Sequence, residues 1–228
     1  MEKAYFNWSS GKDSAMALYH AMKSGKYEVA SLFTVVKKQE ARIAMHEIGM
    51  DLLQRQASAI GIPLSVFPYD WNASEEEYQS AMKRQMGLFR QQNITTALFG
   101  DLYLEELRKR REENCNLQGI QAAFPLWGSD PGELLSEFIS AGFKSIVTCV
   151  DGSLLDESFV GRVIDESFIR DLPPNVDICG ENGEYHSFVF DGPIFRNAVE
   201  FDVVQKYYRD YPNEDGSKQN RYWYLELR

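Results

Sequence analysis

The sequence predicts an α/β fold: a doubly wound parallel sheet followed by a second, smaller α+β domain. In the first half, strand-like apolar stretches alternate with amphipathic helical stretches, a pattern typical of parallel strands joined by right-handed crossovers. The stretch PLWGSDPG (125–132) then interrupts the alternation with a cluster of Pro, Gly, Ser and Asp. We therefore expect one domain over residues 1–127 and a smaller one over residues 128–228.

Five short stretches rich in β-branched, aromatic and aliphatic residues are expected to form the strands of the first sheet. Continuous apolar runs of this kind are typical of strands buried on both faces. The expected strands are residues 3–8, 28–36, 64–69, 95–100 and 121–124.

Four stretches between those strands are expected to be helical, three of them because their apolar residues recur with the spacing of one helical face. Ser74 and Glu77 form a capping-box pattern that opens the third, and the Gly-Ile-Pro at 61–63 ends the second. The expected helices are residues 12–23, 45–60, 75–89 and, in a highly charged stretch, about 102–116.

The second half has a different pattern. One helix (133–141) and one strand (144–150) precede a loop-rich region. Residues 199–208 and 221–227 then flank the turn-forming stretch NEDGSKQN, which predicts an antiparallel hairpin.

Composition excludes several classes of protein. The net charge of −10 argues against a general binder of nucleic-acid backbone. The three cysteines form no CxxC pair, so a zinc knuckle or dithiol site has no support, and reduced thiols fit a cytoplasmic protein. The N-terminus lacks the apolar core of a signal peptide, and no apolar run reaches membrane-spanning length. We expect no nucleic-acid or membrane partner, while a homodimer is compatible with the sequence.

The stretch SSGKDS between the first strand and the first helix is a candidate anion-binding loop. Helix N-termini offer unpaired amides and a partial positive charge, and a glycine lets backbone approach a ligand closely. A Ser/Asp helix cap beside an exposed lysine explains the same residues equally well. The candidate residues are Ser9, Ser10, Gly11, Lys12, Asp13 and Ser14.

A Walker loop is excluded, because Phe6 stands where it needs glycine and Asp13 follows the lysine. The loop instead resembles the SGGxDS pyrophosphate loop of PP-loop ATPases, with Ser10 in place of the middle glycine. Further segments follow in order at 45–64, 99–115, 124–128 and 177–195, the last containing CGENGEYHSF. Together they resemble the diphthine–ammonia ligase family of the adenine nucleotide alpha hydrolase-like superfamily, over residues 3–195.

The resemblance implies an enzyme that uses ATP and Mg²⁺ to activate a carboxyl group as an acyl-adenylate, releasing pyrophosphate. Ammonia then displaces AMP and leaves an amide. In eukaryotes and archaea the carboxyl belongs to diphthine, a modified histidine of elongation factor two. Bacteria carry similar proteins without that target, so the acceptor stays open.

The resemblance also implies roles for residues at the expected sheet edge. Lys12 and the loop amides would hold the leaving pyrophosphate, as a catalytic group and as part of the ATP site. Asp101 ends the fourth strand beside Gly100, so both are expected at the ATP site. Asp13 and Asp101 are the expected carboxylate ligands of Mg²⁺.

Arg108 and Arg111 would share one face of the charged helix at a spacing of three, with Glu112 beside them. A solvated helix with ordinary Glu–Arg pairs explains this run when it is taken alone. The resemblance favours a substrate-binding role for these three residues, but not for the two basic residues between the arginines.

The segment ENGEYH concentrates two carboxylates, an amide and an imidazole in six positions, and Gly180 and Gly183 suggest a tight loop. An acidic surface turn is the alternative. The catalytic candidates are Glu181, Glu184 and His186, with Glu184 or His186 as the expected base. Asn182 and His46 are candidate substrate contacts. Cys179 is expected to pack.

Two other functions stay open. One keeps the adenylating chemistry of a PP-loop ATPase but uses a different, bacterial substrate. The other is a non-catalytic adenine-nucleotide-binding regulatory protein, although such a protein has no evident use for the polar segment at 181–186.

Overall fold

The computed structural model describes residues 1–40, 42–43, 46–70, 72–212 and 219–228. Its first half is a five-stranded parallel sheet in the order β3-β2-β1-β4-β5, which confirms the expected α/β class. The strands are β1 (Glu2–Asn7), β2 (Tyr27–Lys37), β3 (Leu64–Tyr69), β4 (Thr96–Leu98) and β5 (Gln121–Ala123).

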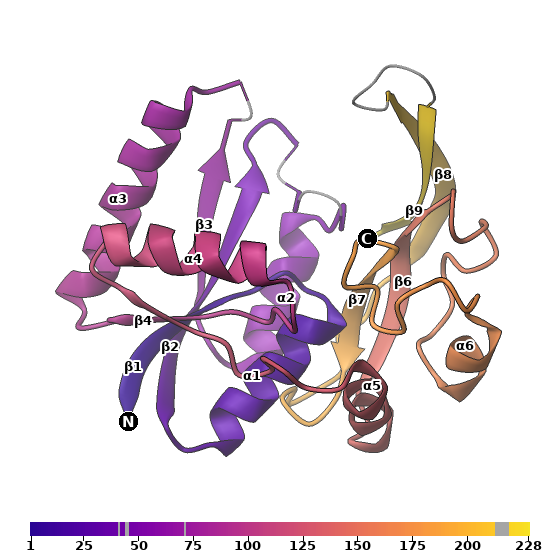
Figure 1. The fold of residues 1–228 in the computed structure, drawn as a ribbon, viewed down its shortest axis with the longest axis horizontal. Helices are drawn as coiled ribbons and strands as arrows, with labels where there is room; N and C mark the ends of the chain where they lie inside the picture. Colours follow the sequence, from indigo (N-terminus) through magenta and orange to yellow (C-terminus); the bar gives the residue numbers. More distant parts are fainter. Residues whose placement is uncertain (41, 44–45, 71, 213–218) are drawn as a thin grey trace.

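The helices of this half cover both faces of the sheet (Figure 1). Strand residues alternate between faces, so Ala4 and Phe6 pack into one core with α1 and α2, whereas Tyr5 packs into a second core with α3 and α4. The helices are α1 (Lys12–Lys23), α2 (Met50–Ile60), α3 (Glu75–Gln91) and α4 (Glu105–Leu117).

The second half is built on a separate four-stranded sheet in the order β7-β6-β9-β8, joined by antiparallel pairs. Strand β8 forms one edge and pairs with β9 in the expected hairpin, whose residues 213–218 lie outside the described residues. The elements are α5 (Pro131–Ser140), β6 (Lys144–Asp151), α6 (Glu166–Asp171), β7 (Tyr185–Asp191), β8 (Val203–Pro212) and β9 (Gln219–Leu227).

Element boundaries differ from the expectations at a few places. The second helix begins at Met50, not at Met45, which lies outside the described residues, and Gly49 is its N-cap. The charged helix begins at Glu105, with Leu104 as N-cap, because residues 101–104 form the loop that leaves the sheet edge. Strand β7 and helix α6 lie in the region that the sequence indicated only as loop-rich. No helix in the described part of the chain has the length and apolarity needed to cross a bilayer.

The two halves share one hydrophobic core. Leu18 of α1 and Leu53 of α2 belong to the same buried cluster as Phe138 of α5 and Phe188 of β7. The second half therefore buries apolar surface of the first as well as its own. The domain boundary at 127/128 stays a prediction.

This shared core makes the first half dependent on the second. A fragment of residues 1–127 leaves the α1/α2 side of its core uncovered, so we expect it to unfold without a cooperative transition, or to aggregate. Thermal unfolding followed by circular dichroism, compared with that of the full chain, checks this. A sharp transition in the fragment would show that the first half folds independently.

Candidate active site

A cleft of about 250 Å³ lies where the carboxyl ends of β1 and β4 meet the loop before β7. In parallel α/β sheets, ligands bind at this edge. Most of the expected residues line it. The lining includes Ser9, Gly11, Lys12, Asp13, Ser14, His46, Gly100, Asp101, Arg111, Glu181 and His186. A more open hollow of about 630 Å³ along α3 contains none of the expected site residues.

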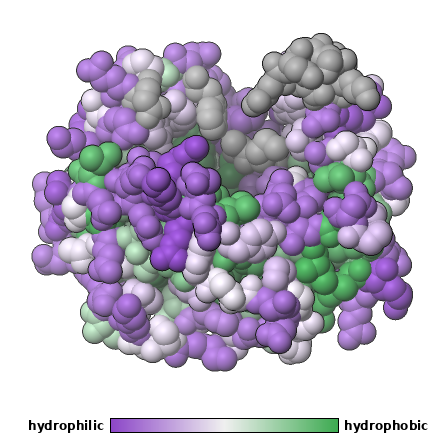
Figure 2. Space-filling model, viewed as in Figure 1, coloured by the Kyte–Doolittle hydropathy of each residue, from purple (hydrophilic) through white to green (hydrophobic). Residues whose placement is uncertain are grey.

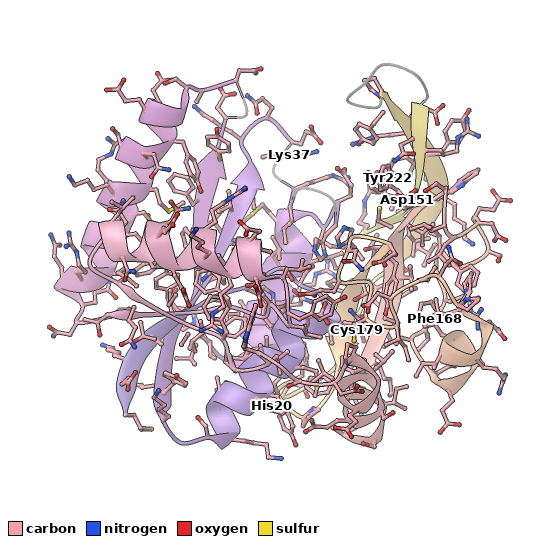
Figure 3. All side chains as sticks on the ribbon, in the orientation of Figure 1. His20, Lys37, Asp151, Phe168, Cys179 and Tyr222 are labelled. Atoms are coloured by element: carbon pink, nitrogen blue, oxygen red, sulfur yellow. The ribbon has the colours of Figure 1, made fainter. Side chains whose placement is uncertain are left out.

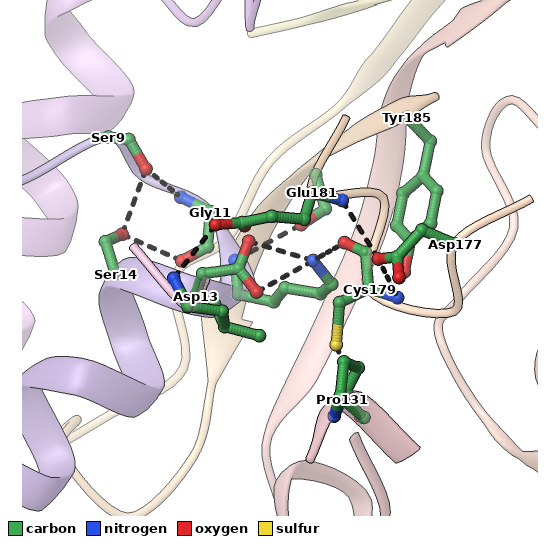
Figure 4. A network of polar contacts seen from close by, with 12 residues as sticks. Ser9, Gly11, Asp13, Ser14, Pro131, Asp177, Cys179, Glu181 and Tyr185 are labelled. Carbon is green, nitrogen blue, oxygen red and sulfur yellow. Dashed lines mark hydrogen bonds and ion pairs between the residues drawn. The ribbon is translucent and has the colours of Figure 1, made fainter. Parts of the chain in front are cut away.

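The loop that enters α1 has the backbone of an anion site. Ser10 is fully buried in the left-handed region, at φ 73°, and Gly11, the N-cap of α1, has no side chain with which to cap the helix. Across the loop, the Ser9 hydroxyl donates to Ser14, which donates in turn to the Gly11 carbonyl (Figure 4). No serine or aspartate of the loop itself therefore caps the first amides of the helix, although the Lys12 amide has a partner in β7.

Gly11 has little room for a side chain. A Cβ at this position would lie 3.1 Å from the Ser187 carbonyl oxygen and 3.2 Å from Cε1 of His46. The Lys12 amide donates to the Ser187 hydroxyl at 3.2 Å. Strand β7 of the second half thus closes one side of the loop.

Lys12 is buried rather than exposed, with a relative exposure of 3%. Its ammonium donates to both oxygens of Asp13 at 2.9 and 2.8 Å and to the Cys179 carbonyl, and lies 4.9 Å from the centre of the Tyr185 ring (Figure 4). Burial alone would lower the pKa of Lys12, but the Asp13 carboxylate and the other partners raise it above its ordinary value. Lys12 is therefore charged and faces the cleft.

The two expected magnesium ligands have different surroundings. Both oxygens of Asp101 contact the Arg111 guanidinium, at 2.7 and 3.0 Å, and Arg111 also covers the Phe99 ring at 4.7 Å. Asp13 is partly exposed, and its ion pair among the described residues is with its neighbour Lys12. Within the described residues no cluster of three His, Cys, Asp or Glu side chains could hold a metal. A single carboxylate suffices for Mg²⁺ that arrives on phosphates, and the more exposed Asp13 suits that role better than Asp101.

Arg108 and Glu112 lie outside the lining of the cleft that the described residues form. Arg108 donates to Glu112 at 2.7 Å and stacks over the rings of Trp127 and Phe124. Figure 2 shows hydrophilic side chains gathered over α4 on this face. The structure therefore brings Arg111 to the cleft and leaves the other two on the helix surface.

The two glutamates of the ENGEYH segment have different surroundings. Glu184 is 4% exposed, and its carboxylate accepts from the amides of Asp177 and Asn182 and from the Asn182 side chain at 3.0–3.1 Å. It stabilises the tight turn. Glu181 instead lines the cleft and accepts from the Leu102 amide at 2.9 Å. Burial raises the pKa of Glu181 to about 7.

His46 and His186 form a pair in the cleft wall, with ring centres 4.6 Å apart. Nδ1 of His46 lies 3.3 Å from the Ser187 carbonyl oxygen. Burial lowers the pKa of His46 to about 4 and that of His186 well below its ordinary value, so both rings are neutral at pH 7. His20 lies elsewhere, 3.0 Å from Glu137 of α5, and Cys179 is buried with its thiol against the Pro131 carbonyl (Figure 3).

Two family models match the chain in succession: the diphthamide synthase N-terminal domain over residues 2–122 and the diphthamide synthase C-terminal domain over residues 130–218. The chain belongs to the diphthamide synthase family. This membership confirms the resemblance that the motifs indicated.

Curated relatives in this family carry the name diphthine–ammonia ligase. The Danio rerio protein is 26% identical over 86% of this chain and 85% of its own length. The Bos taurus protein is 23% identical over 84% of this chain and 79% of its own length. The Schizosaccharomyces pombe protein is 24% identical over 84% of this chain but only 34% of its own length.

The sequence did not reveal the groups from other segments that support the loop at residues 9–14. Gln56 is fully buried and bonds the Ser10 carbonyl, while Ser187 and Val189 of β7 contact the loop through side chain and backbone. A signal for Gln56 existed, because it falls on the buried stripe of α2 between Leu53 and Ile60. The backbone partners have no sequence signature.

Replacing Ser10 with glycine should stabilise the protein by about 1 kcal/mol, because a left-handed backbone is strained for serine but not for glycine. The buried Ser10 hydroxyl also has no hydrogen-bond partner among the described residues. The free energy of unfolding in urea, compared between wild type and Ser10→Gly, measures this. A loss of stability would mean that the serine hydroxyl is satisfied and the backbone unstrained.

Proposed function

We propose that this protein is an ATP-dependent ligase that joins ammonia to a carboxyl group, as the name of its relatives describes. The observation that carries the proposal is the single cleft in which a phosphate-type loop, a buried charged lysine and a carboxylate of raised pKa meet. Membership of the diphthamide synthase family supports the same activity.

The β- and γ-phosphates of ATP bind the amides at the start of α1 and the ammonium of Lys12. Each of these groups carries positive charge toward the cleft, where little water competes. To bind phosphate, Lys12 exchanges its present contact with Asp13. Asp13 would then be able to hold the Mg²⁺ that accompanies ATP, and the bound ion would supply charge neutralisation on the phosphates.

The adenine extends toward an aromatic cavity of about 160 Å³ beneath α3 and α4. This cavity shares Asn7, Phe99 and Arg111 with the cleft, so the two are adjacent. Tyr5 and Phe33 supply apolar walls suited to a flat base.

The reaction has two displacement steps. A carboxylate oxygen of the acceptor attacks the α-phosphorus, the bond to the β-phosphate oxygen breaks, and pyrophosphate leaves with its charge held by Lys12. Ammonia then attacks the acyl carbon, the acyl–oxygen bond breaks, and AMP leaves. The Glu181 carboxylate takes the proton that the attacking nitrogen loses, so that the neutral amide remains. Glu181 is the base because Glu184 is occupied in the turn.

The acceptor is diphthine on elongation factor two where the organism makes diphthamide, and another carboxylic acid elsewhere. Both acceptors use the same cleft and the same activation by ATP.

Lys12→Met should lower turnover by about 100-fold, because it removes the charge that stabilises the departing pyrophosphate. Purified protein with ATP, Mg²⁺, ammonium and the acceptor should release AMP and pyrophosphate in equal amounts, measured by chromatography. Formation of ADP, or release of neither product with any tested acid, would contradict the proposed function.

Glu181→Gln should abolish most of the ammonia-dependent step while leaving ATP binding intact. At saturating free ammonia, wild-type turnover should rise with pH through about 7 as Glu181 loses its proton, and the variant should lose this dependence.

The raised pKa of Glu181 also affects stability, because the folded state holds this proton more tightly than the unfolded chain does. The stabilisation is therefore present below the ordinary glutamate pKa and is lost as pH rises through about 7.

Glu184→Gln is the matched control. Its amide replaces an oxygen that accepts backbone N–H bonds, so it should lower the free energy of unfolding by about 1–3 kcal/mol and keep the pH dependence of turnover. If turnover lost its pH dependence in Glu184→Gln and kept it in Glu181→Gln, Glu184 would be the base and Glu181 the structural carboxylate.

A further inference from the structure

We propose that Gln56 of α2 is a positioning residue that turns the Gly11 amide toward the phosphates of the nucleotide; this rests on the proposed function. Gln56 is fully buried, between apolar neighbours on the inner stripe of its helix. A buried amide costs free energy unless its donors and acceptor are paired. Here the hydrogen bonds of the amide go to Trp8, Ser10 and Val189, in the segments beside the cleft.

The Gln56 amide joins three parts of the chain. Its Nε2 donates to the Val189 carbonyl at 2.7 Å and to the Ser10 carbonyl at 3.2 Å, and its Oε1 accepts from Nε1 of Trp8 at 2.9 Å. The Val189 amide adds a second bond to the Ser10 carbonyl, at 2.9 Å. The end of β1, the loop and β7 are thus held by one side chain.

These bonds fix the direction of the peptide between Ser10 and Gly11. In a planar trans peptide the carbonyl and the following N–H point in opposite directions. Two donors hold the Ser10 carbonyl in the interior, so the Gly11 N–H is directed outward, where Gly11 lines the cleft. Among the described residues that N–H has only a long contact of 3.4 Å to the Ser9 hydroxyl, which leaves it available to an anion.

The left-handed backbone of Ser10 explains why the peptide needs two donors. A non-glycine residue at φ 73° is strained and persists only where surrounding contacts impose it. Without Gln56, the single bond from Val189 would hold this peptide, and rotation of the peptide would carry the Gly11 N–H away from the cleft.

A pure packing role and a positioning role of Gln56 predict different effects of its replacement on the Kd values for ATP and AMP. Gln56→Leu should raise the Kd for ATP about tenfold, the effect of one misdirected hydrogen bond to a charged group. The Kd for AMP should change less than twofold, because AMP lacks the phosphates that the loop binds. Both constants are measured by isothermal titration calorimetry. Equal changes for the two nucleotides, or none, would overturn the inference.

Trp8→Phe is the control, because it removes the Trp8–Gln56 bond and some core volume but leaves both bonds to the Ser10 carbonyl. It should lower stability without changing the ratio of the two Kd values. If wild-type protein bound no ATP, the proposed function itself would fail. If wild type bound ATP and Gln56→Leu bound it equally well, only the positioning role would fail.

Gln56→Glu provides a second measurement should the leucine variant not fold. It keeps the shape and the acceptor for Trp8, but a carboxylate cannot donate to the Ser10 carbonyl. The buried acid holds more of its proton at pH 6 than at pH 8.5. We therefore expect the ATP affinity of this variant, relative to that of wild type, to be lower at pH 8.5 than at pH 6. Its AMP affinity should stay unchanged. A ratio that does not change with pH would contradict the inference.

Discussion

The site depends on the contact between β7 and the loop that enters α1. The Val189 amide and the Ser187 hydroxyl, both from the second half, bond the Ser10 carbonyl and the Lys12 amide of the first half. Strand β7 is an edge of its sheet, so its outer backbone groups are available for this purpose. The phosphate-type loop therefore takes its shape from both halves of the chain. The shared hydrophobic core holds the two halves together.

Two carboxylates that lie three residues apart in the turn before β7 differ in their surroundings. The turn before β7 is closed by Glu184, whose oxygens meet backbone and side-chain donors and so remain in the interior. The tightness of that turn presents Glu181 to the Leu102 amide and the cleft, where burial raises its pKa to about 7. Environment, rather than residue type, separates a structural carboxylate from one suited to proton transfer.

The parallel sheet and its helices could be predicted from sequence, because apolar periodicity and the Ser74 cap are local signals. The loop at 9–14 and the segment at 177–195 were identifiable as motifs, and residues of both line one cleft. The roles within the second motif were not predictable. Whether Glu184 faces inward or outward depends on turn geometry, and the position of Arg108 depends on the aromatic rings of Phe124 and Trp127.

The serine at position 10 illustrates how such a loop tolerates an unfavourable residue. Its left-handed backbone is imposed from outside, by a glutamine on α2 and by an amide on β7, and neither partner is adjacent in sequence. A glycine would need less support to adopt this conformation, but would also leave it more easily. With serine, the strain is stored locally and balanced by the packing of the two halves, so the geometry of the loop is linked to their association.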